Sequence, residues 1–265
     1  MLNFKSHGLG NTMVTVAILM ASAAIANANE HVSVADVLDQ RFLLEVEVGA
    51  VWQSRNDVQI PNDNTGTRFS LMDLVGHGPW PTGRLYFTWN INRNHGLRAL
   101  VAPFQYTETS TFVEPVNFAG QSYQTGVPVT ATYKFNSFRL TYRYAFHRGE
   151  RWRWWIGLTA KLRDAKIGLV QNSTASEDTD RGFVPLLHLA GTYHLSGRWR
   201  LLLDLDGLAG GPGRAFDVAL RVVYEVCPKI SLTAGYRTLE GGADVAEVYN
   251  FAWFNYAVVS FMYGF

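Results

Sequence analysis

Apolar and polar residues alternate with period two through much of the chain, in segments of about ten residues. In residues 138–146, large apolar or aromatic side chains occupy the even positions, and mostly polar or small ones the odd positions. The same alternation recurs at residues 44–53, 84–92, 152–163, 183–195, 201–206, 216–225 and 230–237. Because successive side chains of a strand point to opposite faces, each segment predicts a strand with one apolar and one polar face.

The connections between these segments alternate in length. Tight turns are expected at residues 92–95, 147–150, 196–198 and 227–229. Mostly longer connections are expected at about residues 54–82, 109–126, 164–182, 208–213 and 240–246. Short periplasmic turns and longer external loops are typical of outer-membrane barrels. The sequence therefore predicts an all-β fold, a transmembrane antiparallel up-and-down β-barrel of about ten strands, within a range of about eight to twelve.

The last segment of the chain carries large or apolar side chains on one face and ends on an aromatic residue. These residues are Tyr249, Phe251, Trp253, Ala257, Val259, Phe261, Tyr263 and Phe265. The pattern resembles the C-terminal signature of Gram-negative outer-membrane barrel proteins, without indicating a particular family. The resemblance implies that the barrel-insertion machinery reads the strand ending at Phe265. A soluble sandwich also alternates, but such an apolar strand at its edge would aggregate, whereas a closed barrel leaves no edge.

Aromatic residues near the strand ends are expected to form belts at the two membrane interfaces. The residues expected at the turn side are Trp152, Trp154, Trp155 and Trp199, and those expected at or near the opposite end are Trp52, Trp80 and Tyr106.

The first residues have the features of a secretory signal. Lys5 precedes an apolar run from Met13 to Ala26, and Ala26 and Ala28 are the small residues that a signal peptidase requires. We therefore expect a signal peptide at residues 1–28, cleaved after Ala28, and localisation in the cell outer membrane. Residues 29–41 are expected to form a periplasmic N-terminal segment, helical or extended, and residues 42–265 the outer-membrane barrel.

Composition narrows the function classes. Charged residues make up 17% of the chain and aromatic residues 14%, and the charged share lies below the ~25% usual for soluble domains. Removal of residues 1–28 would leave 22 basic and 22 acidic residues, so there is no basic footprint for nucleic acid. Cys227 is the only cysteine of the sequence. With no Cys/His zinc spacing either, the sequence predicts no metal and no cofactor.

If the apolar faces meet lipid, the polar faces enclose a charged lumen. The inward basic residues expected are Arg84, Arg139, Arg143, Arg153, Lys161, Arg163, Arg221 and Arg237, and the acidic ones Glu45, Glu47, Asp204, Asp206, Asp217 and Glu225. His188 and His194 belong to the same polar face. Because the two charges nearly balance and a barrel of about ten strands is narrow, we expect cross-lumen ion pairs and an occluded interior.

A second group is expected to gather on one side of the extracellular mouth. Its members are Arg163, Asp164, Asp204, Asp206, Arg214, Asp217, Arg237, Glu240 and Asp244. Carboxylates gathered in this way could bind a cation or act as general acid and base, and arginines could hold lipopolysaccharide phosphates. Alternatively, the group is a network of salt bridges that holds short loops.

Three functions remain open at this stage. The first is a structural or ligand-binding outer-membrane protein with an occluded lumen, whose partners are outer-membrane lipids and lipopolysaccharide. The second is a narrow pore for small solutes. The third is an enzyme that uses the Asp/Glu/Arg rim on a lipid or peptide substrate. Fold alone does not choose among them, because small barrels support many functions.

Overall fold

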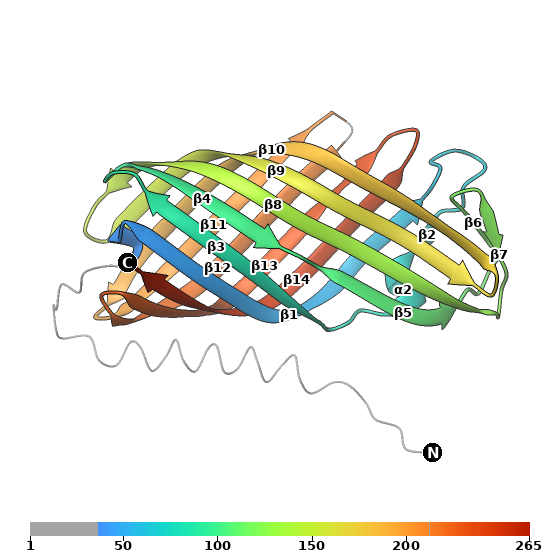
Figure 1. Ribbon diagram of the computed structural model, residues 1–265, viewed down its shortest axis with the longest axis horizontal. Coiled ribbons are helices and arrows are strands. Elements are labelled where there is room, and N and C mark those ends of the chain that lie inside the picture. The colour runs from blue at the N-terminus through green and yellow to red at the C-terminus, as the bar shows by residue number, and fades with distance from the viewer. Residues whose placement is uncertain (1–36, 212) are drawn as a thin grey trace, which may run out of the picture.

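The computed structural model describes residues 37–211 and 213–265. The expected signal peptide and residues 29–36 of the segment after it lie outside the described residues. The described chain forms a closed antiparallel barrel of ten wall strands, which confirms the predicted fold class and strand number (Figure 1). The wall strands are β1 (Phe42–Gln59), β3 (Trp80–Asn90), β4 (His95–Ala102) continued by β5 (Gln105–Thr111), β8 (Pro128–Arg148), β9 (Trp152–Gln171), β10 (Thr174–Ser196), β11 (Trp199–Gly210), β12 (Gly213–Cys227), β13 (Ile230–Asp244) and β14 (Tyr249–Gly264).

Strands adjacent in sequence pair with each other, and β14 pairs back onto β1, so the wall closes. One end, called here the turn end, has tight turns at residues 91–94, 149–151, 197–198 and 228–229. The opposite loop end carries β2 (Phe69–Ser70), α2 (Leu71–Val75) and the hairpin of β6 (Val116–Phe118) and β7 (Gln121–Tyr123) (Figure 1, right). The short helix η1 (Val37–Asp39) lies at the turn end, where Asp39 pairs with Arg148 and Arg153.

In the half of the barrel next to the turn end, apolar side chains face outward as predicted. Leu140 of β8 is 53% exposed on the outer surface, whereas its neighbours Arg139 and Thr141 are buried inside. This part of the wall is called the membrane half below. Of the described residues, none belongs to a helix with the length and hydropathy that crossing a bilayer requires.

Beyond the membrane half, the apolar side chains face the interior and the polar ones face outward. On β9, Ile167 and Leu169 face inward and Leu169 is 0% exposed, while Lys166 faces outward. Strands β9 and β10 stay paired as far as Gln171 and Thr174. The expected loop at residues 164–182 is therefore wrong. On β9 the outward Asp164 and Lys166 alternate with the inward Ala165, Ile167 and Leu169, because a wall that stands in water places apolar side chains inside.

The interior of this loop-end half is an aromatic and aliphatic core. It includes Val51, Val58, Leu71, Trp80, Phe104, Tyr106, Phe118, Tyr133, Ile167, Leu169 and Phe254. The rings of Trp80 and Tyr106 stack with centroids 4.0 Å apart. The expected place of these two residues in an interfacial belt is therefore wrong. The expected place of Trp155 in the belt is also wrong, because its side chain faces the interior and packs against Ala145 and Ala190.

Candidate functional site

Charged side chains close the lumen of the membrane half. Among the described residues, five arginines and five carboxylates are buried there and contact one another. They are Arg84, Arg98, Arg139, Arg221, Arg237, Glu45, Glu47, Asp204, Asp206 and Asp217. We call these ten residues the lumen network. Burial of this kind requires that every charge be paired and hydrogen-bonded.

Asp217 joins three arginines at the centre of the network. Arg237 donates to Asp217 across 2.6 Å and to Glu47 across 3.2 Å. Arg139 donates to Asp217 and to Asp206, in both cases across 2.7 Å. Arg84 donates to Asp217 across 3.0 Å. The network thus links carboxylates from three different strands.

A second path crosses the lumen. Arg221, which is 1% exposed, pairs with Glu45 and lies 3.0 Å from Glu47. Arg98 pairs with Asp204, and its guanidinium lies 3.6 Å from Glu45. The two paths share Glu47, so the lumen is spanned in more than one direction.

Uncharged and histidine side chains complete the closure. His188 Nδ1 lies 2.9 Å from Asp206 and 3.9 Å from Asp204. Thr159 donates to Asp206 across 2.9 Å, and Ser260 donates to Glu45 across 2.9 Å. With these residues every wall strand contributes a side chain, and the lumen is filled at this level.

The structure does not bring the nine expected rim residues together. Asp204, Asp206, Asp217 and Arg237 lie in the lumen network and are buried. Their expected position at the mouth is wrong, because neighbouring strands β9 and β10 continue well beyond them. Asp244 is separate again and accepts a hydrogen bond from Asn62 across 2.7 Å.

Three more of these residues lie on the outer wall of the loop end. Asp164 accepts hydrogen bonds from Lys134 across 2.9 Å and from Arg181 across 3.4 Å. Arg214 donates to Glu240 across 2.9 Å. They mark the level at which the outer surface changes from apolar to polar.

The expected lumen residues also divide. Glu45, Glu47, Arg139, His188 and Arg221 lie in or against the lumen network, as described. Two others lie nearer the turn end, where Arg143 packs over the ring of Trp155 at 5.1 Å and His194 is partly buried.

Sequence reasoning missed Arg98 of the network and Arg200, which lies 2.6 Å from Glu225. Arg98 lies between Leu97 and Ala99, with Leu100 on its own face. Both faces of this segment are therefore mostly apolar, and the alternation that exposes lumen residues elsewhere is weak.

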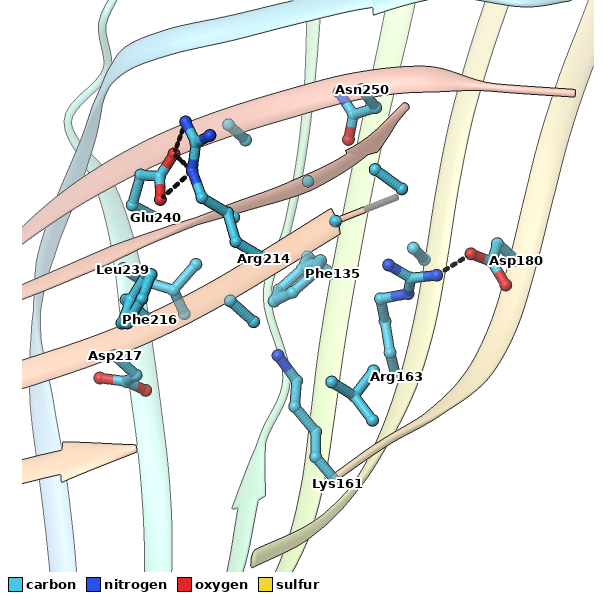
Figure 2. A pocket seen from close by; sticks show the side chains of 18 of the residues that line it. Phe135, Lys161, Arg163, Asp180, Arg214, Phe216, Asp217, Leu239, Glu240 and Asn250 are labelled. Carbon is cyan, nitrogen blue, oxygen red and sulfur yellow. Dashed lines mark hydrogen bonds and ion pairs between the residues drawn. The ribbon is translucent and has the colours of Figure 1, made fainter. Parts of the chain in front are cut away.

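A cleft of about 530 Å³ opens beside the lumen network on the loop-end side (Figure 2). Lys161 of β9 points into it and is 4% exposed. Its Nζ lies 4.8 Å from the centre of the Phe135 ring. No carboxylate oxygen of a described residue lies within ion-pair distance of this amine. In contrast, the neighbouring Arg163 is paired with Asp180.

Asp178 also lines this cleft. Burial and the nearby carboxylate of Asp180 raise the pKa of the Asp178 carboxyl above its usual value. Among the described residues, the cleft thus contains both a carboxyl group without an ion pair and an amine without one.

The cleft lies where the wall divides. Strands β10 and β11 pair from Ser196 and Trp199 as far as Leu187 and Gly207. In the described barrel, residues 174–186 of β10 pair only with β9. We call this opening the β10–β11 split. Pro185, which has no backbone N–H to donate, stands beside it, as is usual for edge strands.

Outward and inward side chains both line the cleft at the split. Phe183 faces outward with 64% exposure, and Phe216 covers the outer side of Gly207. Lys161 lies on the inner side of the same wall. The cleft therefore reaches from the apolar outer surface to the buried amine.

Comparisons with known proteins identify the fold. The outer membrane protease OmpT from Escherichia coli matches with a TM-score of 0.53 and 9% sequence identity, over 89% of this chain and 99% of that chain. The chain shares the closed β-barrel fold of this outer-membrane protein. Neisserial surface protein A matches with a TM-score of 0.39 and 13% identity, over 84% of this chain and 97% of that chain. No protein-family model matches the sequence, and a search of curated proteins finds no significant match. At these identities the likeness establishes the fold and not the activity.

Proposed function

We propose that this protein is an integral outer-membrane barrel that does not conduct and that binds a ligand in its loop-end cleft. The observation that carries the proposal is the pairing of a filled lumen with an adjacent open cleft. The volume of the cleft, about 530 Å³, lies within the ~300–1,000 Å³ typical of small-molecule sites. Apolar walls and a few polar groups are also typical of such sites.

The proposed orientation places the turn end in the periplasm and the loop end outside the cell, as in other outer-membrane barrels. Cleavage after Ala28 remains a prediction. Insertion through the C-terminal strand is also proposed, and Phe265 is available for it because its ring lies at the turn end, 49% exposed.

Outer-membrane lipids are the proposed surroundings of the wall. The side chain of Arg181 is 84% exposed just above the apolar band and pairs only loosely, at 3.4 Å, with Asp164. A lipopolysaccharide phosphate could accept bidentate hydrogen bonds from such a guanidinium.

The two alternative functions find less support. A narrow pore would need a continuous polar path, and the lumen network blocks that path with buried ion pairs. An enzyme would need accessible carboxylates, and Asp206 and Asp217 are buried and bound by arginines. We therefore favour binding over conduction and catalysis.

Fluorescent labelling of the cleft tests the proposal. In a Cys227→Ser background, Ala243→Cys places a label on the cleft wall, and Val113→Cys places one on an exposed loop. The barrel is reconstituted in phosphatidylcholine nanodiscs and exposed to a polar-lipid extract of a Gram-negative outer membrane. We expect the emission of the Ala243 label to change and that of the Val113 label to stay constant. No response at Ala243, or equal responses at both positions, would overturn the proposal.

A further inference from the structure

We infer that the cleft binds an amphiphile with one anionic head group, which Lys161 holds while the apolar chain lies in the β10–β11 split. This inference rests on the proposed ligand-binding function and specifies its ligand. The head group can be a carboxylate or a phosphate, since both accept hydrogen bonds from an ammonium group.

The first support is the balance of charge. The lumen network holds as many arginines as carboxylates, so its charges cancel without Lys161. This lysine is buried at the edge of the network and has no carboxylate of its own among the described residues. A buried ammonium without a counter-ion is costly, and a bound anion would remove that cost.

The second support is the register of the sheet. Lys161 lies directly opposite Arg139 of β8 and directly opposite Val184 of β10. Arg139 already donates to two carboxylates of the network. Like charges at directly opposite positions destabilise a sheet. An anion beside Lys161 would therefore offset the remaining repulsion between the two cations.

The third support is the route to the amine. The split begins at Leu187 and Gly207 and runs between outward-facing Phe183 and Phe216. Arg181 and Arg214 lie on the outer wall, each two residues further toward the loop end than Phe183 and Phe216 respectively. The split thus opens at the top of the apolar band, where the acyl chains of the outer leaflet meet the head groups. Leu186 and Leu208 continue the apolar lining inward.

Most negative groups of the cleft are already paired with arginines, including Glu240, which pairs with Arg214. Asp180 is paired with Arg163. Asp178 lies two residues further along β10 than Asp180 and lines the cleft without an ion pair among the described residues. Asp206 and Asp217 face the lumen network and are occupied by arginines. An anion at Lys161 therefore enters a cleft whose carboxylates, apart from Asp178, are held by arginines.

Binding of matched amphiphiles to the Ala243-labelled barrel tests the inference. The probes are dodecanoate, dodecyl phosphate, neutral dodecanol and cationic dodecyltrimethylammonium, all presented to the same nanodiscs. We expect the two anions to bind at least about tenfold more tightly than dodecanol, because a hydrogen bond between charged groups adds enough binding free energy for that difference in affinity. The cation should not bind. The tighter of the two anions identifies the head group, carboxylate or phosphate.

Three variants separate the head-group contact from general effects. Lys161→Met should weaken dodecanoate binding about tenfold or more and leave dodecanol binding unchanged. Val184→Glu should have the same effect, because its carboxylate would lie opposite Lys161 and pair with it. Lys134→Met removes the same charge from the outer wall, where Lys134 pairs with Asp164, and should leave the binding of dodecanoate and dodecanol unchanged. Heat-modifiable gel mobility checks that each variant folds.

Equal dodecanoate affinity in wild type and either cleft variant would overturn the inference, as would equal binding of dodecanoate and dodecanol by the wild type. A label that responds to the outer-membrane extract but to none of the amphiphiles would remove the head-group assignment and leave the ligand-binding function standing. A label that responds to neither would remove both.

Discussion

The two halves of the barrel bury opposite kinds of side chain. Strand β9 passes through both of them. In the membrane half its Leu158 and Leu162 face outward, and Lys161 between them faces the interior. In the loop-end half Ile167 and Leu169 face the interior, and Lys166 faces outward. One strand with one unbroken alternation thus serves two environments.

The difference teaches that alternation fixes which residues share a face and leaves open which face is inside. The medium around the wall decides that. Lipid outside favours apolar outer faces and forces the charges inward, where they must pair. Water outside favours the reverse arrangement. The change of sidedness along β9 therefore marks the boundary that we propose for the membrane.

The largest expected effect comes from breaking the charged interior. Asp217→Asn leaves three arginines without their shared carboxylate and should lower the free energy of unfolding by about 3–5 kcal/mol. Guanidinium unfolding in lipid vesicles, followed by tryptophan emission, measures it. A loss below about 1 kcal/mol would show that these ion pairs are not desolvated, since exposed pairs contribute only that much.

A slightly smaller effect should follow from a change in the apolar interior. Phe254→Ala removes a fully buried ring from the loop-end core and should cost about 3 kcal/mol. Limited proteolysis should then cut the loop end first, while the membrane half stays protected. If the cut sites fall at the turn end instead, the loop-end core does not stabilise the loop-end half of the barrel.

Placing the same charge on one strand at two heights tests the boundary itself. Leu140→Lys exposes an ammonium to lipid and should cost about 2 kcal/mol. Thr132→Lys, also outward on β8 but beyond the boundary, should change the unfolding free energy by less than about 0.5 kcal/mol. The same vesicle unfolding assay compares them. Equal costs at the two positions would contradict the boundary proposed for the outer wall.

The smallest effect is expected on the outer wall at the loop end. Arg214→Met removes the ion pair with Glu240, which is partly exposed. Pairs of this kind contribute about 0–1 kcal/mol and are screened by salt. We expect a loss below about 1 kcal/mol that fades at high ionic strength. A larger or salt-independent loss would mean that this pair is shielded from water.

The sequence predicts the membrane half well, because one physical rule governs it. Apolar residues such as Leu140 and Phe138 alternate with Arg139 and Thr141, and the structure places the two sets on opposite faces. The rule fails at Trp80, Tyr106 and residues 164–182, because it assumes lipid around the whole wall. Apolar residues inside a water-exposed wall have the same period.

The candidate site was harder to predict than the fold. Ion pairs across the lumen join strands that are not neighbours, and their heights depend on the stagger of the whole sheet. Asp217 and Arg237 were correctly expected to face the lumen, but at the height of the mouth, whereas they lie deeper, in the lumen network. The β10–β11 split had one visible signal. Pro185 interrupts an otherwise regular strand, and proline inside a sheet marks an edge.

Single-channel recording in planar lipid bilayers tests most directly whether the membrane half is closed. The purified barrel, inserted from detergent, should give no stable conductance steps across the membrane, because the lumen network fills the interior. Stable steps of uniform size in the wild-type protein would contradict the account. They would show that ions pass through a lumen that the buried ion pairs are held to block.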